Sequence, residues 1–292
     1  MSIQKKLTAA LGLVGLVVSA VAFGAPESSY NLPIGVTRIS REVYGLHMLI
    51  FWVCVAISVV VFGAMIYSLV KYRKSVGAVA DTSIVHSTKA EIIWTIIPVI
   101  ILVAMAVPAT RTLIMIEDTR HSQLTIKATG YQWKWQYEYL SRTEGSAEKA
   151  VTGVSFFSAL AEDSNFTRQL GSGLDPKNVP NYLLNVDHPL VIPSGIKVRL
   201  LLTANDVIHA WWVPQFGMKR DAIPGFVNEI WIQVDEGKEG TYRGNCVELC
   251  GRDHGFMPVV VEVKSRKDFD VWLAAQQQAT ATATTAATTA AL

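Results

Sequence analysis

The chain has 292 residues, of which 50% are hydrophobic and 17% charged, and its formal net charge is +2. This composition is too apolar for an ordinary soluble protein and too polar for a chain that lies in a membrane throughout. It therefore predicts a mixed architecture, with membrane segments and an aqueous domain.

The N-terminal segment has the pattern of a cleavable secretory signal peptide. It begins with the basic residues Lys5 and Lys6, continues with an apolar run, and ends among small residues such as Ala20 and Ala22. We therefore expect residues 1–25 to be removed from the mature protein. The alternative is a retained first transmembrane helix.

Two long apolar stretches follow, at about residues 46–70 and 92–113. Each is long enough to cross a hydrocarbon core of roughly 30 Å, and this length makes two buried core helices a poorer interpretation. The second contains Pro98 and Pro108, which spanning helices tolerate because neighbouring groups can satisfy the freed carbonyls. Residues 26–115 are thus predicted to form an N-terminal segment and a transmembrane hairpin.

The loop between these stretches indicates how the hairpin is oriented. It carries Lys71, Arg73, Lys74 and Lys89 against the single acidic residue Asp81. By the positive-inside rule the loop lies in the cytoplasm, so both ends of the chain lie outside. An exported N-terminus agrees with this orientation.

Residues 116–278 are predicted to form an external β-domain. Short β-rich runs alternate there with Gly, Pro, Asn and Asp, which is typical of a β-sandwich or barrel. Residues 141–181 are polar and rich in Ser and Gly, and we expect them to form a long surface loop inserted in this domain. A terminal helix is expected over 265–278, and the Ala/Thr tail at 279–292 is expected to be disordered.

The sequence "GNCVELCGRDHGFMP" begins at Gly244 and contains four soft or borderline metal ligands, Cys246, Cys250, His254 and Met257. Two cysteines and two histidines without methionine would suggest tetrahedral zinc, whereas thiolate and thioether ligands together favour copper. Two cysteines can also bridge two metal ions and leave one histidine and one further ligand for each. A disulfide is the alternative in an oxidising compartment.

A second imidazole for such a site lies upstream. His209 stands in "NDVIHAWWVP", at the end of a predicted strand that can meet the cysteine loop in a sandwich. Glu248 lies between the two cysteines, where its backbone carbonyl can face the metal while its side chain points elsewhere.

From about Val43 to Leu273 the chain resembles subunit II of the haem–copper cytochrome c oxidases. The motifs that carry the resemblance occur in the order of that family, and they are "AEIIWTIIP", "GYQWKWQYEY", "LLTANDVIHAWWVP", "GMKRDAIPG" and "GNCVELCGRDHGFMPVVVE". The resemblance implies a two-helix transmembrane hairpin followed by an all-β, cupredoxin-like sandwich or barrel. It also implies a dinuclear copper centre of the CuA type in that domain.

Carried over by position, the resemblance implies six copper ligands, namely His209, Cys246, Cys250, His254, Met257 and the backbone carbonyl of Glu248. It further implies that the Glu248 side chain binds a magnesium or manganese ion at the interface with subunit I.

Four more residues occupy positions with a role in the family. Trp133 matches the tryptophan through which electrons arrive from cytochrome c, and Glu138 and Asp206 match acidic docking positions. Glu91 matches the acid at the mouth of a proton path into subunit I. From the residues alone, the alternative for Trp133 and Trp135 is a strand aromatic packed on the sheet, which we favour for Trp135, and the alternative for Glu91 is an anchor at the membrane interface.

The chain departs from the family pattern at three positions. Tyr131 and Lys134 replace the His and Tyr that are common beside the tryptophan, and Phe226 replaces the usual Arg. None of these residues is an implied copper ligand. The departures concern the cytochrome c surface and the contacts with other subunits.

The function that the resemblance implies is electron transfer in a terminal respiratory oxidase that reduces oxygen to water and pumps protons. The expected partners are subunit I, other oxidase subunits, cytochrome c and membrane lipid, with no nucleic acid. The expected location is a bacterial inner membrane, with the copper domain on the periplasmic side. The alternative is a membrane-anchored periplasmic protein that binds or delivers copper.

Overall fold

The computed structural model divides the chain into two compact units, Met1–Ile34 and Gly35–Leu292. The residues that it describes are 31–79, 82–83, 86–145 and 147–290, with side chains described up to residue 282 except at Glu144. The signal peptide predicted for residues 1–25 lies outside the described residues. All that follows concerns the second unit.

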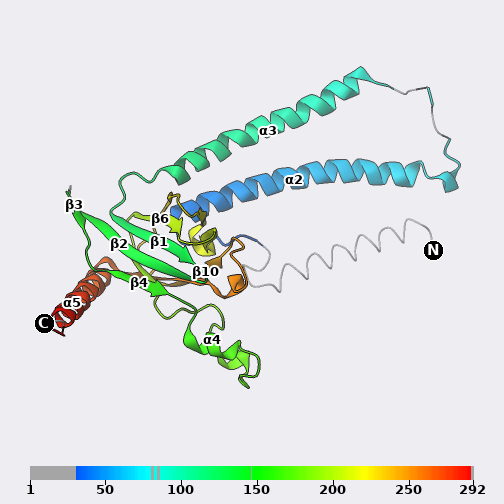
Figure 1. Cartoon of the computed structure of the whole chain (residues 1–292). Coiled ribbons are helices and arrows are strands. Elements are labelled where there is room, and N and C mark those ends of the chain that lie inside the picture. The colour runs from blue at the N-terminus through cyan, green and yellow to red at the C-terminus, as the bar shows by residue number, and fades with distance from the viewer. Residues whose placement is uncertain (1–30, 80–81, 84–85, 146, 291–292) are drawn as a thin grey trace. The chain divides into compact units, whose positions relative to one another are not determined.

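Two long helices, α2 (Arg38–Lys71) and α3 (Thr88–Glu117), contain the two stretches predicted to span a membrane. They contact each other and are joined through the short helix η1 (Lys74–Val76) (Figure 1). Their most apolar segments have mean hydropathies of 2.8 and 2.5. At a rise of about 1.5 Å per residue both helices exceed the roughly 30 Å of a hydrocarbon core, so their ends extend beyond it.

Helix α2 begins eight residues before the predicted span because a capping box starts it at Thr37. The Thr37 Oγ1 accepts a hydrogen bond from the Ser40 N–H at 3.0 Å and donates one to the Phe216 carbonyl at 2.8 Å. Arg41 forms an ion pair with Asp235 in the loop after β9 (Asn228–Ile232). These contacts fix the first turn of α2 to the β-domain. Because this turn is polar, a search for apolar runs does not detect it.

The end of α3 is also fixed to the β-domain. The Trp231 indole N–H donates to the Met115 carbonyl at 3.1 Å, and Arg220 Nη1 lies 2.9 Å from Glu117 Oε1. Because the start of α2 and the end of α3 both bind this domain, the chain enters and leaves the hairpin on the same side.

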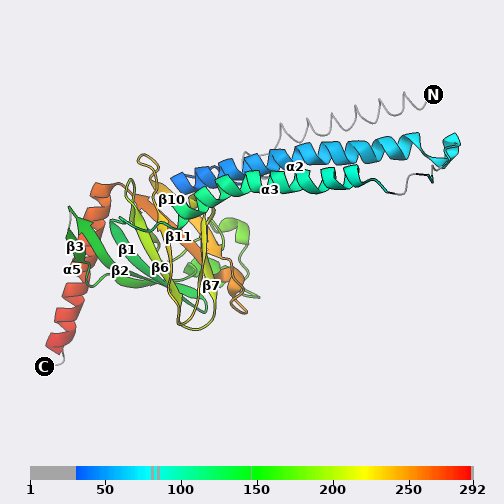
Figure 2. The same cartoon turned by 90° about the horizontal axis from the view of Figure 1, so that it is seen from above.

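The β-domain consists of two sheets (Figure 2). The first has the order β3-β2-β1-β6-β9, with β4 also paired to β2. Besides β9, it is made by β1 (Leu124–Tyr131), β2 (Lys134–Glu144), β3 (Ala147–Ala150), β4 (Ser155–Ser158) and β6 (Val198–Ala204). The second has the order β5-β11-β10-β7-β8, made by β5 (Leu190–Pro193), β7 (His209–Val213), β8 (Met218–Ala222), β10 (Gly240–Cys246) and β11 (Pro258–Lys264). The predicted hairpin followed by an all-β sandwich is confirmed.

The core of the domain follows from alternation along the strands. Trp135, Tyr137 and Tyr139 are at every second position of β2, and all three are fully buried. The Trp211 indole N–H, on the second sheet, donates to the Tyr137 hydroxyl at 3.2 Å. Large aromatic side chains with a satisfied polar atom therefore join the two layers.

The predicted insertion at 141–181 differs from the long surface loop that its polarity suggested. It contains the end of β2, the strands β3 and β4, the helix α4 (Glu162–Thr167) and the short helix η2 (Pro176–Asn178). Val154 is buried, its carbonyl accepts the Tyr139 N–H at 3.0 Å, and Phe156 stacks near Tyr139. These few apolar residues pack the insertion against β2. Because their neighbours are polar, the sequence shows no strand pattern there.

Helix α5 (Arg266–Ala290) closes the chain. The Ser265 Oγ accepts the Asp268 N–H at 3.2 Å, as expected for a cap, and Phe269 is buried beside Tyr139. The helix runs through 279–290, where a disordered tail was expected. Alanine is the strongest helix former, which favours continuation of a helix that packing has already started.

Candidate metal centre

Strand pairing brings the candidate ligands together from distant parts of the chain. His209 begins β7 and Cys246 ends β10, and these strands pair with Cys246 opposite Trp211. The chain then leaves the sheet as a loop and returns at Met257, whose carbonyl accepts the Cys246 N–H at 2.9 Å. Cys250 in this loop lies within 4.8 Å of His209, the first residue of β7. We call residues 247–257 the ligand loop.

The side chains of four predicted ligands form a row of pairwise contacts. The Sγ atoms of Cys246 and Cys250 are 3.8 Å apart. His209 Nδ1 lies 3.9 Å from the Cys246 Sγ, and His254 Nδ1 lies 3.5 Å from the Cys250 Sγ. Each cysteine therefore has the other cysteine on one side and an imidazole on the other.

The separation of the two sulfurs decides between the two interpretations of the cysteine pair. A disulfide needs about 2.05 Å, so at 3.8 Å both cysteines are free thiols. Metal–thiolate bonds are about 2.3 Å, so both sulfurs can reach a shared metal. His209 is 0% exposed, and Cys246 and Cys250 are 3% and 2% exposed. The geometry thus fits two buried thiolates that share a metal.

The structure places the other two predicted ligands at the same loop. The Glu248 carbonyl lies 3.4 Å from the Cys246 Sγ, and the Glu248 residue is exposed, as expected from its place between the cysteines. Met257 is buried at the end of the ligand loop. In the part of the chain that the structure describes, the group of His, Cys, Asp or Glu residues close enough to hold a metal is His209, Cys246 and Cys250.

Asp206 has a contact that the sequence did not predict. Its Oδ1 lies 2.9 Å from His209 Nε2, and its Oδ2 accepts the Gln132 N–H at 2.7 Å. A carboxylate on one ring nitrogen fixes the orientation of the imidazole and directs the other nitrogen, Nδ1, toward Cys246. Asp206 therefore orients His209, and its docking role stays a prediction. The signal in the sequence is an acid three residues before the histidine.

The pKa values of the two cysteines are shifted in opposite directions. Burial acts to raise the pKa of the Cys246 thiol, but contacts with His209 and the Ala210 backbone outweigh it and lower this pKa overall. Burial and the neighbouring Cys246 raise the pKa of Cys250 to about 12. For His209, burial acts to lower the pKa, yet the contacts with Cys246 and Asp206 leave it above its ordinary value. One thiolate therefore forms more readily than two.

Gly130, at the end of β1, is needed for the position of His209. A Cβ there would lie 2.6 Å from His209 Cδ2. We expect Gly130→Ala to displace the imidazole and weaken binding of Cu²⁺ by about 10- to 100-fold, as loss of a ligand-orienting contact does. The matched control is Gly255→Ala in the ligand loop, where a Cβ would have no neighbour within 4 Å. Equal affinities of the two variants in a chelator competition would contradict this.

Trp133 lies against the ligand loop and is half-buried. Its indole N–H donates to the Cys250 carbonyl at 3.2 Å, and the Gln132 side-chain amide donates to the same carbonyl at 2.9 Å. The Arg252 guanidinium lies 5.6 Å from the centre of the indole. Trp133 is therefore connected by one hydrogen bond to a candidate ligand residue. Trp135, in contrast, is fully buried and stacks edge-on near His209.

The other predicted site residues lie away from the cluster. Glu138 forms a cross-strand ion pair with Lys127, with 3.5 Å between Oε2 and Nζ. Glu91 is in the first turn of α3, where its Oε1 lies 2.7 Å from His86 Nδ1. Each is at the surface of the described chain.

Comparisons with known proteins agree on one family. The family model described as cytochrome C oxidase subunit II, periplasmic domain, matches residues 124–264, and the model of its transmembrane domain matches residues 25–112. The probable cytochrome c oxidase subunit 2 of Rickettsia bellii (strain RML369-C) is 37% identical over 272 residues, which are 92% of this chain and 93% of that protein. Cytochrome c oxidase subunit 2 of Arabidopsis thaliana is 38% identical over 82% of this chain and 86% of its own length. The crystal structure of the periplasmic domain of subunit II of cytochrome oxidase (CoxB) of Bradyrhizobium japonicum is 36% identical, with a TM-score of 0.43, and covers 56% of this chain and 99% of that chain.

Proposed function

The chain belongs to the cytochrome c oxidase subunit II family, and we propose that it receives electrons from a cytochrome c at a dinuclear copper centre. It delivers them to the haem of subunit I, where oxygen is reduced to water and protons are pumped. The two apolar helices and the match to the family's transmembrane domain make it a membrane-anchored oxidase subunit. A bacterial inner membrane, with the β-domain in the periplasm, is the proposed location.

The observation that carries this proposal is the pair of buried, free thiols flanked by two imidazoles. Cys246 and Cys250 are proposed as bridging ligands, with His209 and His254 at the two ends and Met257 and the Glu248 carbonyl as further ligands. Held by these residues, a dinuclear copper centre would supply one-electron transfer, with the charge shared between its two metals. The protein holds these donors close together before any metal binds, so little has to move when the charge changes.

The test is to purify the full chain in detergent, load it with copper under reducing conditions, and then measure its metal content and spectrum. We expect two coppers per chain and, after oxidation, a mixed-valence electron paramagnetic resonance signal. Binding of a single zinc in preference to copper, or a disulfide that copper cannot replace, would overturn the proposal.

The affinity for copper is expected to increase with pH. Because burial and the neighbouring Cys246 raise the pKa of Cys250 to about 12, this thiol holds a proton near neutral pH that a metal must displace, and the raised pKa of His209 acts in the same direction. Each proton released makes the affinity rise about tenfold per pH unit. Calorimetry in two buffers with different ionisation enthalpies counts these protons. An affinity that stays constant across neutral pH would contradict the expectation.

Glu91 is proposed as the entrance of a proton path into subunit I. Its support is its position in the first turn of α3, at the end of the spanning helix opposite to the β-domain, and its exposed carboxylate. We expect Glu91→Ala to lower the oxygen consumption of the assembled oxidase several-fold while copper reduction by cytochrome c stays unchanged. Lys89→Ala, in the same turn, is the control. Unchanged turnover would leave Glu91 as an interfacial anchor.

The proposed magnesium or manganese site uses the exposed Glu248 side chain and needs oxygen ligands from subunit I. Metal analysis of the assembled oxidase with Glu248→Gln tests it, and an unchanged magnesium or manganese content would exclude the role. The alternative function, a membrane-anchored protein that only binds or delivers copper, is not favoured, because both domains match the oxidase family.

A further inference from the structure

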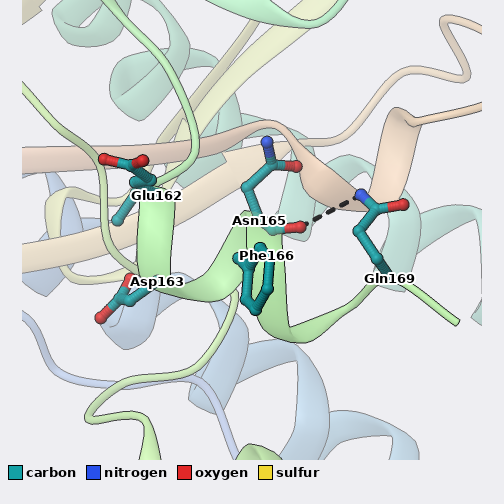
Figure 3. Close-up of a pocket in the computed structure, with 6 residues that line it drawn as sticks. Glu162, Asp163, Asn165, Phe166 and Gln169 are labelled. Atoms are coloured by element: carbon teal, nitrogen blue, oxygen red, sulfur yellow. Dashed lines mark hydrogen bonds between the residues drawn. The ribbon is translucent and has the colours of Figure 1, made fainter. Parts of the chain in front are cut away.

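Helix α4, in the insertion between β4 and β5, is anchored to the rest of the domain close to the ligand loop. Ser164 is buried in α4, and its hydroxyl accepts the Leu183 N–H at 3.1 Å. The Ala161 N–H donates to the Asn185 carbonyl, and the Asn185 side chain accepts from Arg243 of β10, the strand that ends at Cys246. Figure 3 shows α4 with the side chains that line a surface pocket there. The insertion is therefore fixed to the strand that presents a candidate ligand.

Arg168 follows α4 directly and reaches the ligand loop. Its Nε donates to Asn165 Oδ1 at 2.8 Å, which holds the base of the guanidinium. Its Nη2 lies 3.5 Å from Asp253 Oδ2, and its guanidinium lies 4.3 Å from the centre of the Phe256 ring. The Arg168 side chain is 20% exposed and that of Asp253 is 17% exposed. Because this pair is largely shielded from water, it is screened less than a surface ion pair.

The two contacts of Arg168 bracket a candidate copper ligand. Asp253 immediately precedes the short helix η4 (His254–Phe256), and the Asp253 carbonyl accepts the Phe256 N–H at 2.9 Å. His254, which lies between them, has its Nδ1 3.5 Å from the Cys250 Sγ. A guanidinium that pairs with residue 253 and stacks on residue 256 therefore limits how this turn can move.

We propose that Arg168 is a positioning residue for the copper centre: it clamps the turn Asp253–Phe256 and so holds His254 in place to bind metal. The proposal rests on the proposed function, and it gives the insertion a role in the site. The planar guanidinium of Arg168 can make both contacts of this clamp, because one face can stack on an aromatic ring while its edge pairs with a carboxylate.

Arg252 is the other cation near Asp253, with 3.6 Å between its Nε and Asp253 Oδ1. Its side chain is 83% exposed, and its guanidinium lies over Trp133 rather than Phe256. Exposed ion pairs contribute little, so Arg252 cannot replace the clamp. A pocket of about 180 Å³ lined by Trp133, Asn165, Arg168, Asp253 and Phe256 also leaves the turn room to move if Arg168 is removed.

The first test uses the metal-free full chain in detergent and measures amide hydrogen exchange over residues 251–257. We expect Arg168→Met to make this turn exchange roughly tenfold faster, in line with the loss of a shielded ion pair and a cation–π contact. Lys177→Met removes one positive charge from the exposed helix η2 of the same insertion, and it should leave exchange unchanged. Equal exchange in the two variants would overturn the proposal. Asp253→Asn removes the same ion pair and decides the matter if Arg168→Met does not fold.

The second test loads the same chains with copper. We expect Arg168→Met to lower copper affinity by about 10- to 100-fold and to alter the electron paramagnetic resonance pattern, as loss of groups that orient ligands does. Arg168→Lys should restore part of the affinity, because it keeps the charge but not the planar stack. An unchanged affinity and spectrum in Arg168→Met would overturn the proposal. If the wild-type chain binds no copper, the proposed function fails, while the exchange experiment still decides whether Arg168 holds the turn.

Discussion

Replacing Cys250 by serine is expected to abolish the dinuclear copper spectrum and reduce the copper content from two ions per chain to at most one. Cys250 Sγ lies 3.8 Å from Cys246 and 3.5 Å from His254, so it is the atom that connects the two halves of the proposed site. A serine hydroxyl has nearly the same shape, so the fold should persist. It is a hard oxygen donor that does not ionise near neutral pH, and it cannot replace a soft bridging thiolate.

The chain supplies a matched control for this substitution. Cys54, the third cysteine, is exposed on α2 and far from the β-domain in sequence. Cys54→Ser should leave copper content and spectrum unchanged. Metal analysis and electron paramagnetic resonance of the two variants check the expectation. A Cys250→Ser chain that still binds two coppers with the mixed-valence signal would show that Cys250 does not bridge.

The features that sequence predicted well are those with a local signature. The spanning helices were visible as uncharged runs, although their polar first turns were not, because a capping box at Thr37 carries no hydropathy signal. Four proposed side-chain ligands lie within the twelve residues from Cys246 to Met257. Their types could be interpreted without knowing the pairing of strands, and His209 could be added because it lies at a strand end.

The features that sequence missed depend on contacts between distant segments. Gly130 supports His209 through a close approach of β1 to β7, two strands of different sheets. Arg168 contacts Asp253, which lies 85 residues further along the chain. No spacing rule predicts these contacts, because they depend on how segments far apart in the sequence pack in the folded domain.

The insertion also explains two departures from the family pattern. The Lys134 Nζ lies 4.1 Å from the centre of the Phe157 ring, and Tyr131 meets the same ring edge-on at 5.5 Å. Phe157 belongs to β4, which a search for alternating apolar residues did not find. Tyr131 and Lys134 thus pack against the insertion next to Trp133. Nothing in the structure explains Phe226, which is exposed.

Replacing Trp133 by glutamine is expected to slow reduction of the copper centre by cytochrome c about 100-fold, the order of loss that follows when a reaction partner is misplaced by about 1 Å. Sequence placed Trp133 outside every ligand motif, yet its indole donates a hydrogen bond to the Cys250 carbonyl at 3.2 Å. The half-exposed indole is therefore joined by one hydrogen bond to the backbone of a proposed copper ligand. We expect copper affinity to fall only slightly, because Gln132 still donates to the same carbonyl.

Stopped-flow reduction by cytochrome c across a range of ionic strengths measures the effect. Trp133 is neutral, so the variant and the wild type should show the same salt dependence, since charged groups set the attraction between the partners and salt screens it. Gln132→Leu is the control, because it removes the other hydrogen bond to the Cys250 carbonyl but keeps the indole. A slow Gln132→Leu variant would assign the effect to the position of the ligand loop rather than to the indole. Reduction of the Trp133→Gln variant at the wild-type rate would mean that electrons arrive by another route, and Arg252, whose guanidinium covers the indole, would then be the first surface residue to replace.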